Sequence, residues 1–152
     1  MIEVRRIGED DWQAWRSLRL AALATDPDAF GSTLAEWSGP KDLEPRWRAR
    51  LAGSPFSALL ELDGRPAGMV GAFGAGAAVE LVSLWVAPPA RGRGLGEAAI
   101  AAVAAFAGAR DVVLSVRAAN AAAIRLYLRC GFLDEGPSAD EPLERRMRRP
   151  AS

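Results

Sequence analysis

The sequence feature that most constrains the fold is a glycine-rich turn, Arg91-Gly92-Arg93-Gly94-Leu95-Gly96, between a strand pattern and a helix pattern. Before the turn, residues 79–86 are mostly apolar and lead into Pro88-Pro89, which predicts a strand that stops there. After it, apolar residues recur at helical spacing from Leu95 to Phe106, which predicts an amphipathic helix. The chain is therefore expected to contain a strand-turn-helix unit whose turn uses backbone conformations that favour glycine.

The remaining patterns predict a mixed α/β (α+β) fold. Helical spacing is expected over residues 11–24, 30–37, 43–52 and 120–129, and strand patterns over residues 2–7, 56–62, 66–73, 112–116, 131–133 and 143–148. Hairpin strands come first and strand-helix units later. This order predicts a mixed, mostly antiparallel sheet of six to seven strands, with about four helices on both faces. We interpret residues 1–150 as one domain, since no linker interrupts them.

Composition narrows the class of function. Nineteen basic and nineteen acidic residues balance, which gives no overall attraction to nucleic acid. The sequence has no histidine and one cysteine, which argues against Ser-His-Asp chemistry, most zinc sites and an intrachain disulfide. The longest apolar run, residues 98–107, is shorter than the roughly 18 residues of a membrane span. We expect a cytoplasmic protein with no bound metal, no nucleic acid partner and no membrane association.

The glycine-rich turn suits a phosphate-bearing ligand. Its glycines let backbone N–H groups approach a ligand, and the helix start adds unpaired N–H groups at a positive dipole end. Arg91 and Arg93 add two cations, so pyrophosphate is the expected ligand. A plain connector is one alternative. A dinucleotide site is another, because residues 94–99 fit G-x-G-x-x-A, but the next strand ends at Arg117 without the carboxylate that would hold a ribose.

Two motifs together resemble the GNAT superfamily of N-acetyltransferases. Residues 91–96 match its R/Q-x-x-G-x-G/A signature, and residues 120–132, Asn-Ala-Ala-Ala-Ile-Arg-Leu-Tyr-Leu-Arg-Cys-Gly-Phe, are similar to its N-x-x-A-x-x-L-Y-x-x-x-G-F segment. The motifs occur in the family's order, separated by one helix and one strand. The resemblance implies a GNAT-like fold and an enzyme that moves an acetyl group from acetyl-CoA to a primary amine by direct attack.

The resemblance also implies how the cofactor is held. Backbone N–H groups of the turn would bind its pyrophosphate, and the preceding strand end would pair with its pantetheine arm. The residues implied in cofactor binding are Leu84, Trp85, Val86, Arg91, Gly92, Arg93, Gly94, Leu95, Gly96 and Asn120. An N–H near Val86 could polarise the thioester carbonyl. Asn120 is also expected to cap the helix that follows it.

Two side chains are candidates for proton transfer. Tyr127, the only tyrosine, occupies the motif position of the general acid that protonates the leaving thiolate, although it could simply pack on a helix face. Glu80 is the candidate base that frees the amine. Strand alternation predicts that it shares a face with Val82, Leu84 and Val86, an apolar setting that would raise its pKa. A solvated glutamate at the start of a strand is the alternative. Glu36 is a weaker candidate, and a water relay would need no base.

The acceptor is expected to be a small-molecule or peptide amine. Its pocket should lie between the region of Phe30, Glu36 and Trp37 and the last hairpin, where acidic residues could receive a cation. Cys130 is interpreted as small and buried. The resemblance allows a homodimer, although no sequence feature specifies one. Two other functions stay open: a non-catalytic acyl-CoA-binding module of the same fold and, less favoured, a dinucleotide-binding oxidoreductase.

Overall fold

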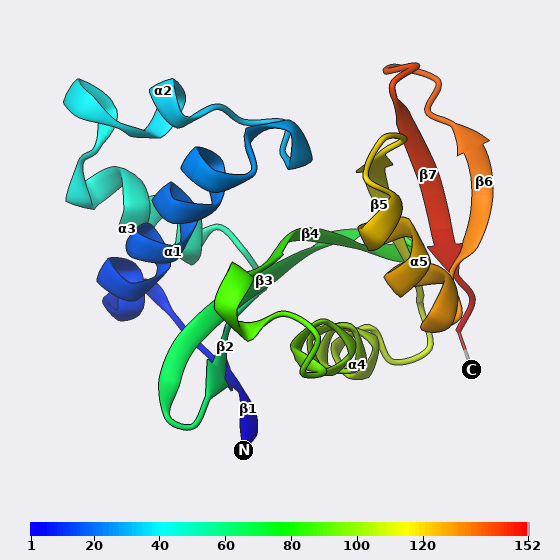
Figure 1. Cartoon of the computed structure of the whole chain (residues 1–152), viewed down its shortest axis with the longest axis horizontal. Coiled ribbons are helices and arrows are strands. Elements are labelled where there is room, and N and C mark those ends of the chain that lie inside the picture. The colour runs from blue at the N-terminus through cyan, green and yellow to red at the C-terminus, as the bar shows by residue number, and fades with distance from the viewer. Residues whose placement is uncertain (152) are drawn as a thin grey trace.

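The computed structural model describes residues 1–151 and shows a seven-stranded sheet with helices on both faces (Figure 1). The strands are β1 (Ile2–Arg6), β2 (Phe56–Leu62), β3 (Arg65–Ala75), β4 (Ala78–Val86), β5 (Asp111–Arg117), β6 (Leu133–Pro137) and β7 (Glu144–Arg149). The α-helices are α1 (Trp12–Thr25), α2 (Leu34–Trp37), α3 (Glu44–Ala52), α4 (Leu95–Ala107) and α5 (Ala121–Arg129). Short 3-10 turns lie at Glu9–Asp11, Pro27–Ala29, Gly39–Lys41 and Pro88–Ala90. The expected mixed, mostly antiparallel sheet is confirmed.

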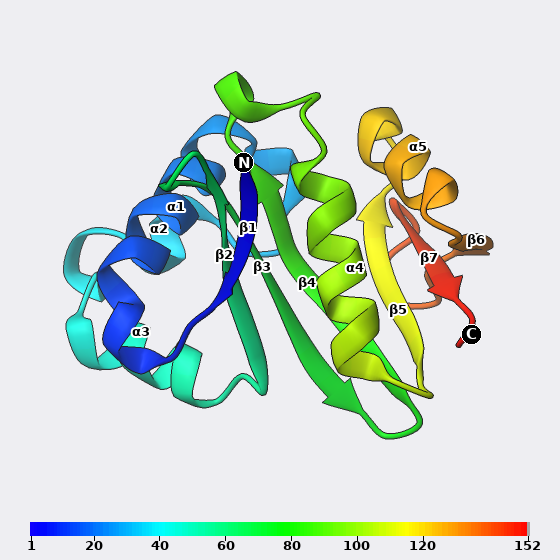
Figure 2. The same ribbon diagram turned by 90° about the horizontal axis from the view of Figure 1, so that it is seen from below.

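The sheet divides into two parts at its parallel pair. The strand order is β1-β2-β3-β4-β5-β7-β6, and β4 and β5 run parallel while the other described neighbours are antiparallel. The β4–β5 pairing covers only Ala78–Glu80 against Asp111–Val113. Beyond these residues the two strands diverge, as Figure 2 shows. The separation leaves the carboxyl end of β4 paired on one edge only.

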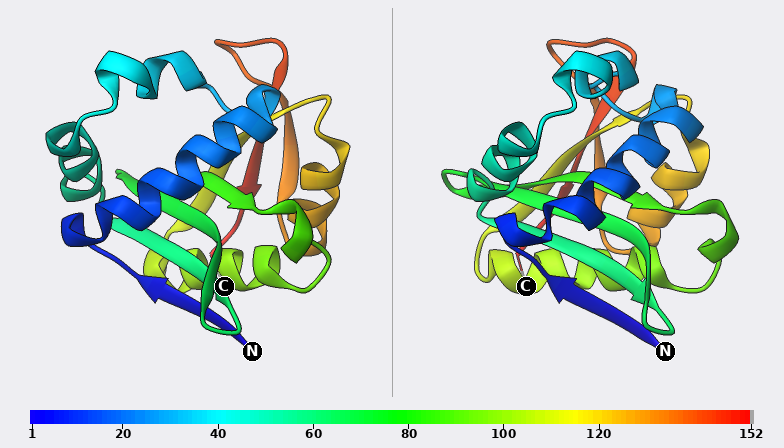
Figure 3. Two further views of the ribbon diagram at one scale, coloured as in Figure 1. Left: turned by 60° about the vertical axis from the view of Figure 1, so that its left-hand side comes forward. Right: turned by 90° about the vertical axis from the view of Figure 1, so that its left-hand side faces the viewer.

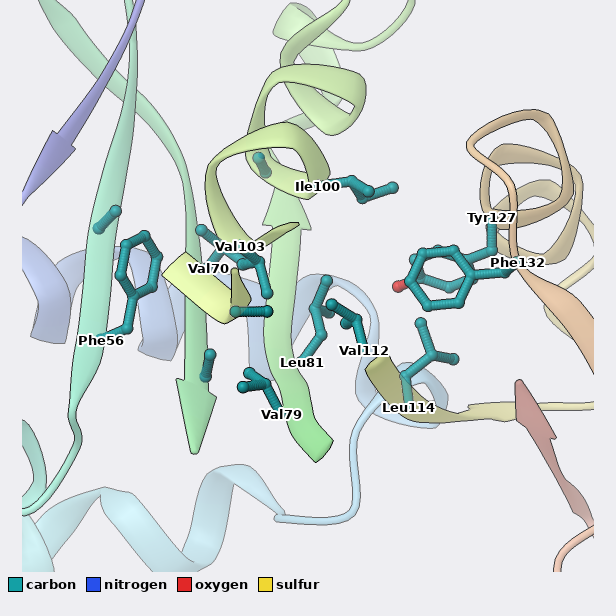
Figure 4. Close-up of a cluster of buried hydrophobic side chains, with 14 of the residues drawn as sticks. Phe56, Val70, Val79, Leu81, Ile100, Val103, Val112, Leu114, Tyr127 and Phe132 are labelled. Atoms are coloured by element: carbon teal, nitrogen blue, oxygen red, sulfur yellow. The ribbon is translucent and has the colours of Figure 1, made fainter. Parts of the chain in front are cut away.

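Two apolar layers pack on opposite faces of the sheet. The larger layer joins the sheet to α4 and α5, and Figure 4 shows its centre around Val70, Leu81 and Val103. The smaller layer places Trp15 and Trp47, from α1 and α3, against the other face. Figure 3 shows α1 crossing this face while α4 lies beneath the opposite one. Because both faces are covered near β2–β4, the middle of the sheet is fixed on two sides.

One predicted helix is shorter than expected. Only Leu34–Trp37 of the expected helical region 30–37 forms an α-helix. The Thr33–Glu36 capping box starts this single turn, and Gly39-Pro40 follows it at once. On α4, the buried stripe runs through Ile100, Val103 and Ala107 besides Leu95 and Ala99. Phe106 is only half-buried because it lies at the margin of the layer, with its ring centroid 5.2 Å from that of Phe56.

Candidate functional site

A cavity of about 450 Å³ lies where β4 and β5 separate. It is bounded by the end of β4, the glycine-rich turn, the start of α4 and one side of α5. Of the residues expected to bind a cofactor or to donate a proton, its lining contains Leu84, Trp85, Val86, Arg91, Gly92, Gly94, Leu95, Gly96, Asn120 and Tyr127. Arg93 and Glu80 do not line it. The structure thus brings together two motifs that lie far apart in the sequence.

The glycine-rich turn presents unpaired backbone donors to this cavity. Gly92 and Gly94 have φ angles of 77° and 92°, a left-handed conformation that favours glycine. Gly94 is the N-cap of α4, whose first turn lacks internal acceptors for its N–H groups. Among the described residues, no acceptor receives a hydrogen bond from the backbone N–H groups of residues 92–97. The turn can therefore bind an anion through several backbone donors at the positive end of the α4 dipole.

The two arginines of the turn differ in their surroundings. Arg91 donates from Nε to the carbonyl oxygen of Val86 at 2.9 Å and from Nη2 to Asp26 Oδ2 at 2.7 Å. Its guanidinium therefore ties the turn to the ends of β4 and α1. Arg93 does not line the cavity, and its charge helps to lower the pKa of the Asp63 carboxyl, after the effect of the N-terminal ammonium. Neither side chain is positioned solely for a ligand.

The end of β4 carries a bulge that changes which residues share a face. Ser83 has a φ of 57°, and the β3–β4 register shifts at the same point. As a result, Leu84 and Val86 pack in the α4 layer together with Val79 and Leu81, while Trp85 packs in the α1–α3 layer. The expectation that Glu80 shares a face with Leu84 and Val86 is therefore wrong, since the bulge resets the alternation.

Glu80 lies in a polar setting. Its side chain is 39% exposed, and Oε1 lies 3.9 Å from Nη1 of Arg146 on β7. The same Arg146 nitrogen donates to Ser115 Oγ on β5 at 2.8 Å. The apolar surroundings expected for Glu80 are not found. Its cross-strand partner on β3 is Phe73, so the two side chains project from the same side of the sheet.

Tyr127 is positioned by α5. Asn120 caps this helix, because its Oδ1 accepts a hydrogen bond from the Ala123 N–H at 3.2 Å, as predicted. The Tyr127 side chain is 7% exposed, with its ring edge-to-face with Phe132 at 5.4 Å (Figure 4). Among the described residues, no hydrogen bond involves its hydroxyl. Burial, followed by the nearby Cys130, raises the Tyr127 pKa above its usual range. The hydroxyl therefore stays protonated at neutral pH and is available as a donor.

Three charged residues of the cavity lining, Asp26, Glu97 and Arg129, were not predicted from the sequence. Asp26 accepts hydrogen bonds from both Trp85 Nε1 and Arg91 Nη2, and the Trp85 bond is the main reason that its pKa is lowered. Glu97 and Arg129, on α4 and α5, form an ion pair of 3.7 Å. In the sequence, Asp26 stands in Asp26-Pro27-Asp28, a pattern that indicates only the end of a helix. Glu97 directly follows the first motif and Arg129 stands at a variable position of the second, so no pattern marked them.

Four further observations concern residues 1–151. A second cavity of about 330 Å³ adjoins it, lined by Thr25–Ala29, Arg117, Ala119 and Asn120. Cys130 is half-buried, and burial raises the pKa of its thiol, which does not favour a nucleophile. Within residues 1–151, no helix is long and apolar enough to cross a membrane. The same residues contain no group of three side chains suited to hold a metal ion.

The chain is similar to a known protein family and to solved structures. The sequence profile of the Acetyltransferase (GNAT) family matches residues 11–132. No curated protein matches the sequence. Three solved structures share the fold at low identity. The ribosomal-protein-S18-alanine N-acetyltransferase of Escherichia coli is 22% identical, with a TM-score of 0.71 over 100% of this chain and 95% of that one.

The other two structures contain a coenzyme. YncA of Salmonella typhimurium, with acetyl-CoA, is 20% identical, with a TM-score of 0.74 over 100% of this chain and 95% of that one. The PaiA N-acetyltransferase of Thermoplasma acidophilum, in complex with coenzyme A, is 16% identical, with a TM-score of 0.73 over 99% of each chain. At these identities the likeness concerns the fold.

Proposed function

The chain belongs to the Acetyltransferase (GNAT) family and is an acetyl-CoA-dependent N-acetyltransferase, and on that premise we propose how its own residues carry out the transfer. The observation that carries the proposal is the cavity between β4 and β5. It is lined by the glycine-rich turn, whose backbone donors have no acceptor among the described residues, and by Tyr127 of α5. This arrangement suits a long ligand with a phosphate group at one end and a reacting group at the other.

The N–H groups of residues 92–97 are proposed to bind the pyrophosphate of acetyl-CoA. They fit this role because they have no acceptor among the described residues and lie at the start of α4. Leu84–Val86 would pair with the pantetheine arm, since this stretch pairs with β3 on one edge and lines the cavity on the other. An N–H near Val86 would polarise the thioester carbonyl as the amine attacks.

Tyr127 is proposed as the general acid. The C–S bond of the thioester breaks as the C–N bond forms, and the departing sulfur takes a proton from the Tyr127 hydroxyl. A raised pKa keeps this group protonated, which a donor requires. The phenolate is then reprotonated by the proton that the amine loses, through solvent. A purely packing role for Tyr127 is less well supported, because the residue lines the cavity as well as packing on Phe132.

Glu80 is proposed as the base that takes a proton from the acceptor ammonium. Support comes from its place on β4 ahead of the cavity and from its position on the face opposite α4. Arg146 Nη1 lies 3.9 Å from Glu80 Oε1, and the half-exposed Glu80 carboxylate can also attract a cationic amine. A water relay is the alternative, in which Glu80 is dispensable.

The acceptor is proposed to be a primary amine of a small molecule or a peptide. Among the solved structures of this fold are a spermidine N-acetyltransferase chimera and the ribosomal-protein-S18-alanine enzyme, so the fold accommodates both classes. A homodimer and a cytoplasmic location stay predictions. A non-catalytic role is disfavoured because Tyr127 lines the cavity.

Thermal-shift titration tests the proposed cofactor site. Acetyl-CoA and coenzyme A should raise the melting temperature, because they bind only the folded chain. NAD should leave it unchanged. Stabilisation by NAD and none by acetyl-CoA would refute the proposed cofactor site and support the dinucleotide alternative.

A further inference from the structure

Two arginines with unsatisfied donors lie beside each other in the layer between α1, α3 and the sheet. Arg19 on α1 and Arg50 on α3 are partly buried, and in each the Nη1 atom is buried without a hydrogen-bond partner among the described residues. Their neighbours on the same helices differ. Arg16 pairs with Asp42, and Arg48 pairs with Asp10 and Glu44. The lack of partners is therefore a property of this pair.

The positive charges of Arg19 and Arg50 repel each other. Burial lowers the pKa of Arg50, and burial together with the nearby charge of Arg50 lowers the pKa of Arg19 to about 10. Both groups remain cations at neutral pH. Glu36 acts on Arg19 in the favourable direction, but only as the smallest of the three effects. Two partly buried cations with so little compensation favour the binding of an anion.

Aromatic rings fix the orientation of both guanidinium groups. Arg19 Cζ lies 4.8 Å from the centroid of the Phe30 ring. Arg50 Cζ lies 5.0 Å from the centroid of Phe73 and 5.6 Å from that of Trp15. An aromatic ring contacts the flat face of a guanidinium and uses none of its N–H donors. A carboxylate matches the N–H edge of a guanidinium because its two oxygens can accept two parallel hydrogen bonds.

The arginine pair lies close to the proposed base. Phe73, which contacts Arg50, is the cross-strand partner of Glu80, so both project from the same side of the sheet. Figure 3 shows that α1 lies on this side and α4 on the other. A molecule bound at the arginine pair would thus extend along β3 toward Glu80 on β4.

We propose that Arg19 and Arg50 form an anion site that binds a carboxylate of the acceptor while its amine points toward Glu80. This inference rests on the proposed function and narrows the acceptor to amines that also carry a carboxylate, such as amino acids. A phosphate-bearing amine presents related chemistry, and the experiment separates the two.

The first test measures anion binding without any assumption about the acceptor. Melting temperatures are recorded with saturating coenzyme A at constant ionic strength, with chloride replaced stepwise by acetate or by inorganic phosphate. Acetate should raise the melting temperature of the wild-type chain by about 3 °C or more relative to chloride. No rise with acetate overturns the proposal. A rise with phosphate alone overturns the carboxylate assignment.

Variants locate the site. Arg19→Gln and Arg50→Gln should lose the acetate response, whereas Arg48→Gln, two residues from Arg50 on the same helix, should keep it. Phosphate stabilises many proteins without a specific site. For both anions, binding at the arginine pair is therefore judged by the difference in melting-temperature response between the Arg19 or Arg50 variants and Arg48→Gln. An equal response in all variants overturns the site. If either glutamine variant fails to fold, Arg50→Lys and Arg19→Lys, which retain the charge but lack the planar fork, replace it and should weaken the response.

The second test is kinetic. Thiol release is followed for amino acids and for their carboxamides, in which a neutral group replaces the carboxylate, and rates are compared at a pH where the amines of both series are mostly unprotonated. The wild-type chain should prefer the carboxylates by about tenfold or more in kcat/KM, and both arginine variants should lose that preference. Equal rates for the two series overturn the proposal. Acetyl-CoA binding is measured in the same samples: its absence refutes the proposed function, whereas its presence without carboxylate preference refutes only the anion site.

Discussion

Asp26 joins the end of α1 to the end of β4, because its Oδ2 accepts a hydrogen bond from Trp85 Nε1 at 2.8 Å. The same oxygen accepts from Arg91 Nη2 at 2.7 Å, and Arg91 Nε donates to the carbonyl oxygen of Val86. One carboxylate therefore fixes the glycine-rich turn relative to the strand that precedes it. Its effect on a ligand is indirect, through the positions of the backbone donors.

Replacing Asp26 should weaken cofactor binding without removing the chemistry. In Asp26→Asn the ion pair with Arg91 is lost, so we expect the KM for acetyl-CoA to rise about fivefold or more while kcat changes less, in line with the loss of one charge-assisted hydrogen bond. Asp28→Asn is the matched control, because the described residues form no hydrogen bond to the Asp28 carboxylate. Steady-state kinetics measures both. A KM equal to that of the control would contradict the positioning role.

Tyr127→Phe should lower kcat by roughly 10²- to 10⁴-fold, the usual contribution of a general acid. Thermal stabilisation by coenzyme A should persist, since only a hydroxyl is removed. Because burial raises the Tyr127 pKa, the wild-type rate should not fall through loss of this proton anywhere below about pH 10. A variant with wild-type turnover would show that Tyr127 only packs.

Glu80→Gln should slow acetylation most at neutral pH. An alkylamine has a pKa of roughly 10.4, so the benefit of a base should shrink as the pH rises toward that value. The pH profile of kcat/KM for the variant should therefore converge on that of the wild type at alkaline pH. Glu144→Gln, a half-buried glutamate on β7, serves as the control. Identical profiles for all three chains would favour a water relay.

Two glycines at opposite ends of α4 allow the effect of backbone strain on stability to be separated from the effect on acetyl-CoA binding. Gly94 and Gly108 cap the two ends of this helix with φ angles of 92° and 62°. Alanine at Gly94 should cost roughly 1–2 kcal/mol of the free energy of unfolding, measured in urea, and alanine at Gly108 at least as much, because its ψ of −116° lies outside the left-handed helical region. Only Gly94→Ala should also raise the KM for acetyl-CoA, because only Gly94 lies in the turn. Equal effects of the two variants on KM would mean that the turn does not bind the cofactor.

Asp42 should make the stability of the α1–α3 pair depend on pH. Hydrogen bonds from Arg16, and then from Trp47 Nε1, lower its pKa to about 2. A carboxyl whose pKa is lower in the folded chain stabilises it above the unfolded value of about 3.9, and this contribution is lost as the pH falls toward 2. The difference in melting temperature between wild type and Asp42→Asn should therefore be largest above pH 5 and shrink below pH 4. Asp140→Asn, in the last loop, should show no such difference.

Local patterns in the sequence predicted the strands, the longer helices and most of the cavity lining, because those features depend on residue spacing. The turn at residues 92–94 required glycine, and the apolar period of residues 95–106 required a helix, so both were visible. The bulge at Ser83 was not, since serine gives no signal for a positive φ and the register shift depends on β3. Its consequence was the wrong face for Glu80.

Polar contacts between residues far apart in the chain could not be predicted from the sequence either. Asp26 lies 59 residues before Trp85 and 65 before Arg91, and only the folded chain brings them together. No motif or spacing in the sequence marked Arg19 or Arg50 for a role. Their lack of hydrogen-bond partners among the described residues results from the packing of α1 and α3 on β3. The residue pattern of one helix alone cannot predict that packing.

The short pairing between β4 and β5 has a consequence for the lifetime of the protein. Three residue pairs join the two parts of the sheet along this seam, and under the proposed placement the pantetheine arm adds backbone hydrogen bonds where the chain has none. Such a ligand binds only the native chain and raises its free energy of unfolding with concentration. Resistance to proteolysis would then vary with the supply of coenzyme A, so that the enzyme accumulates when its own donor is abundant.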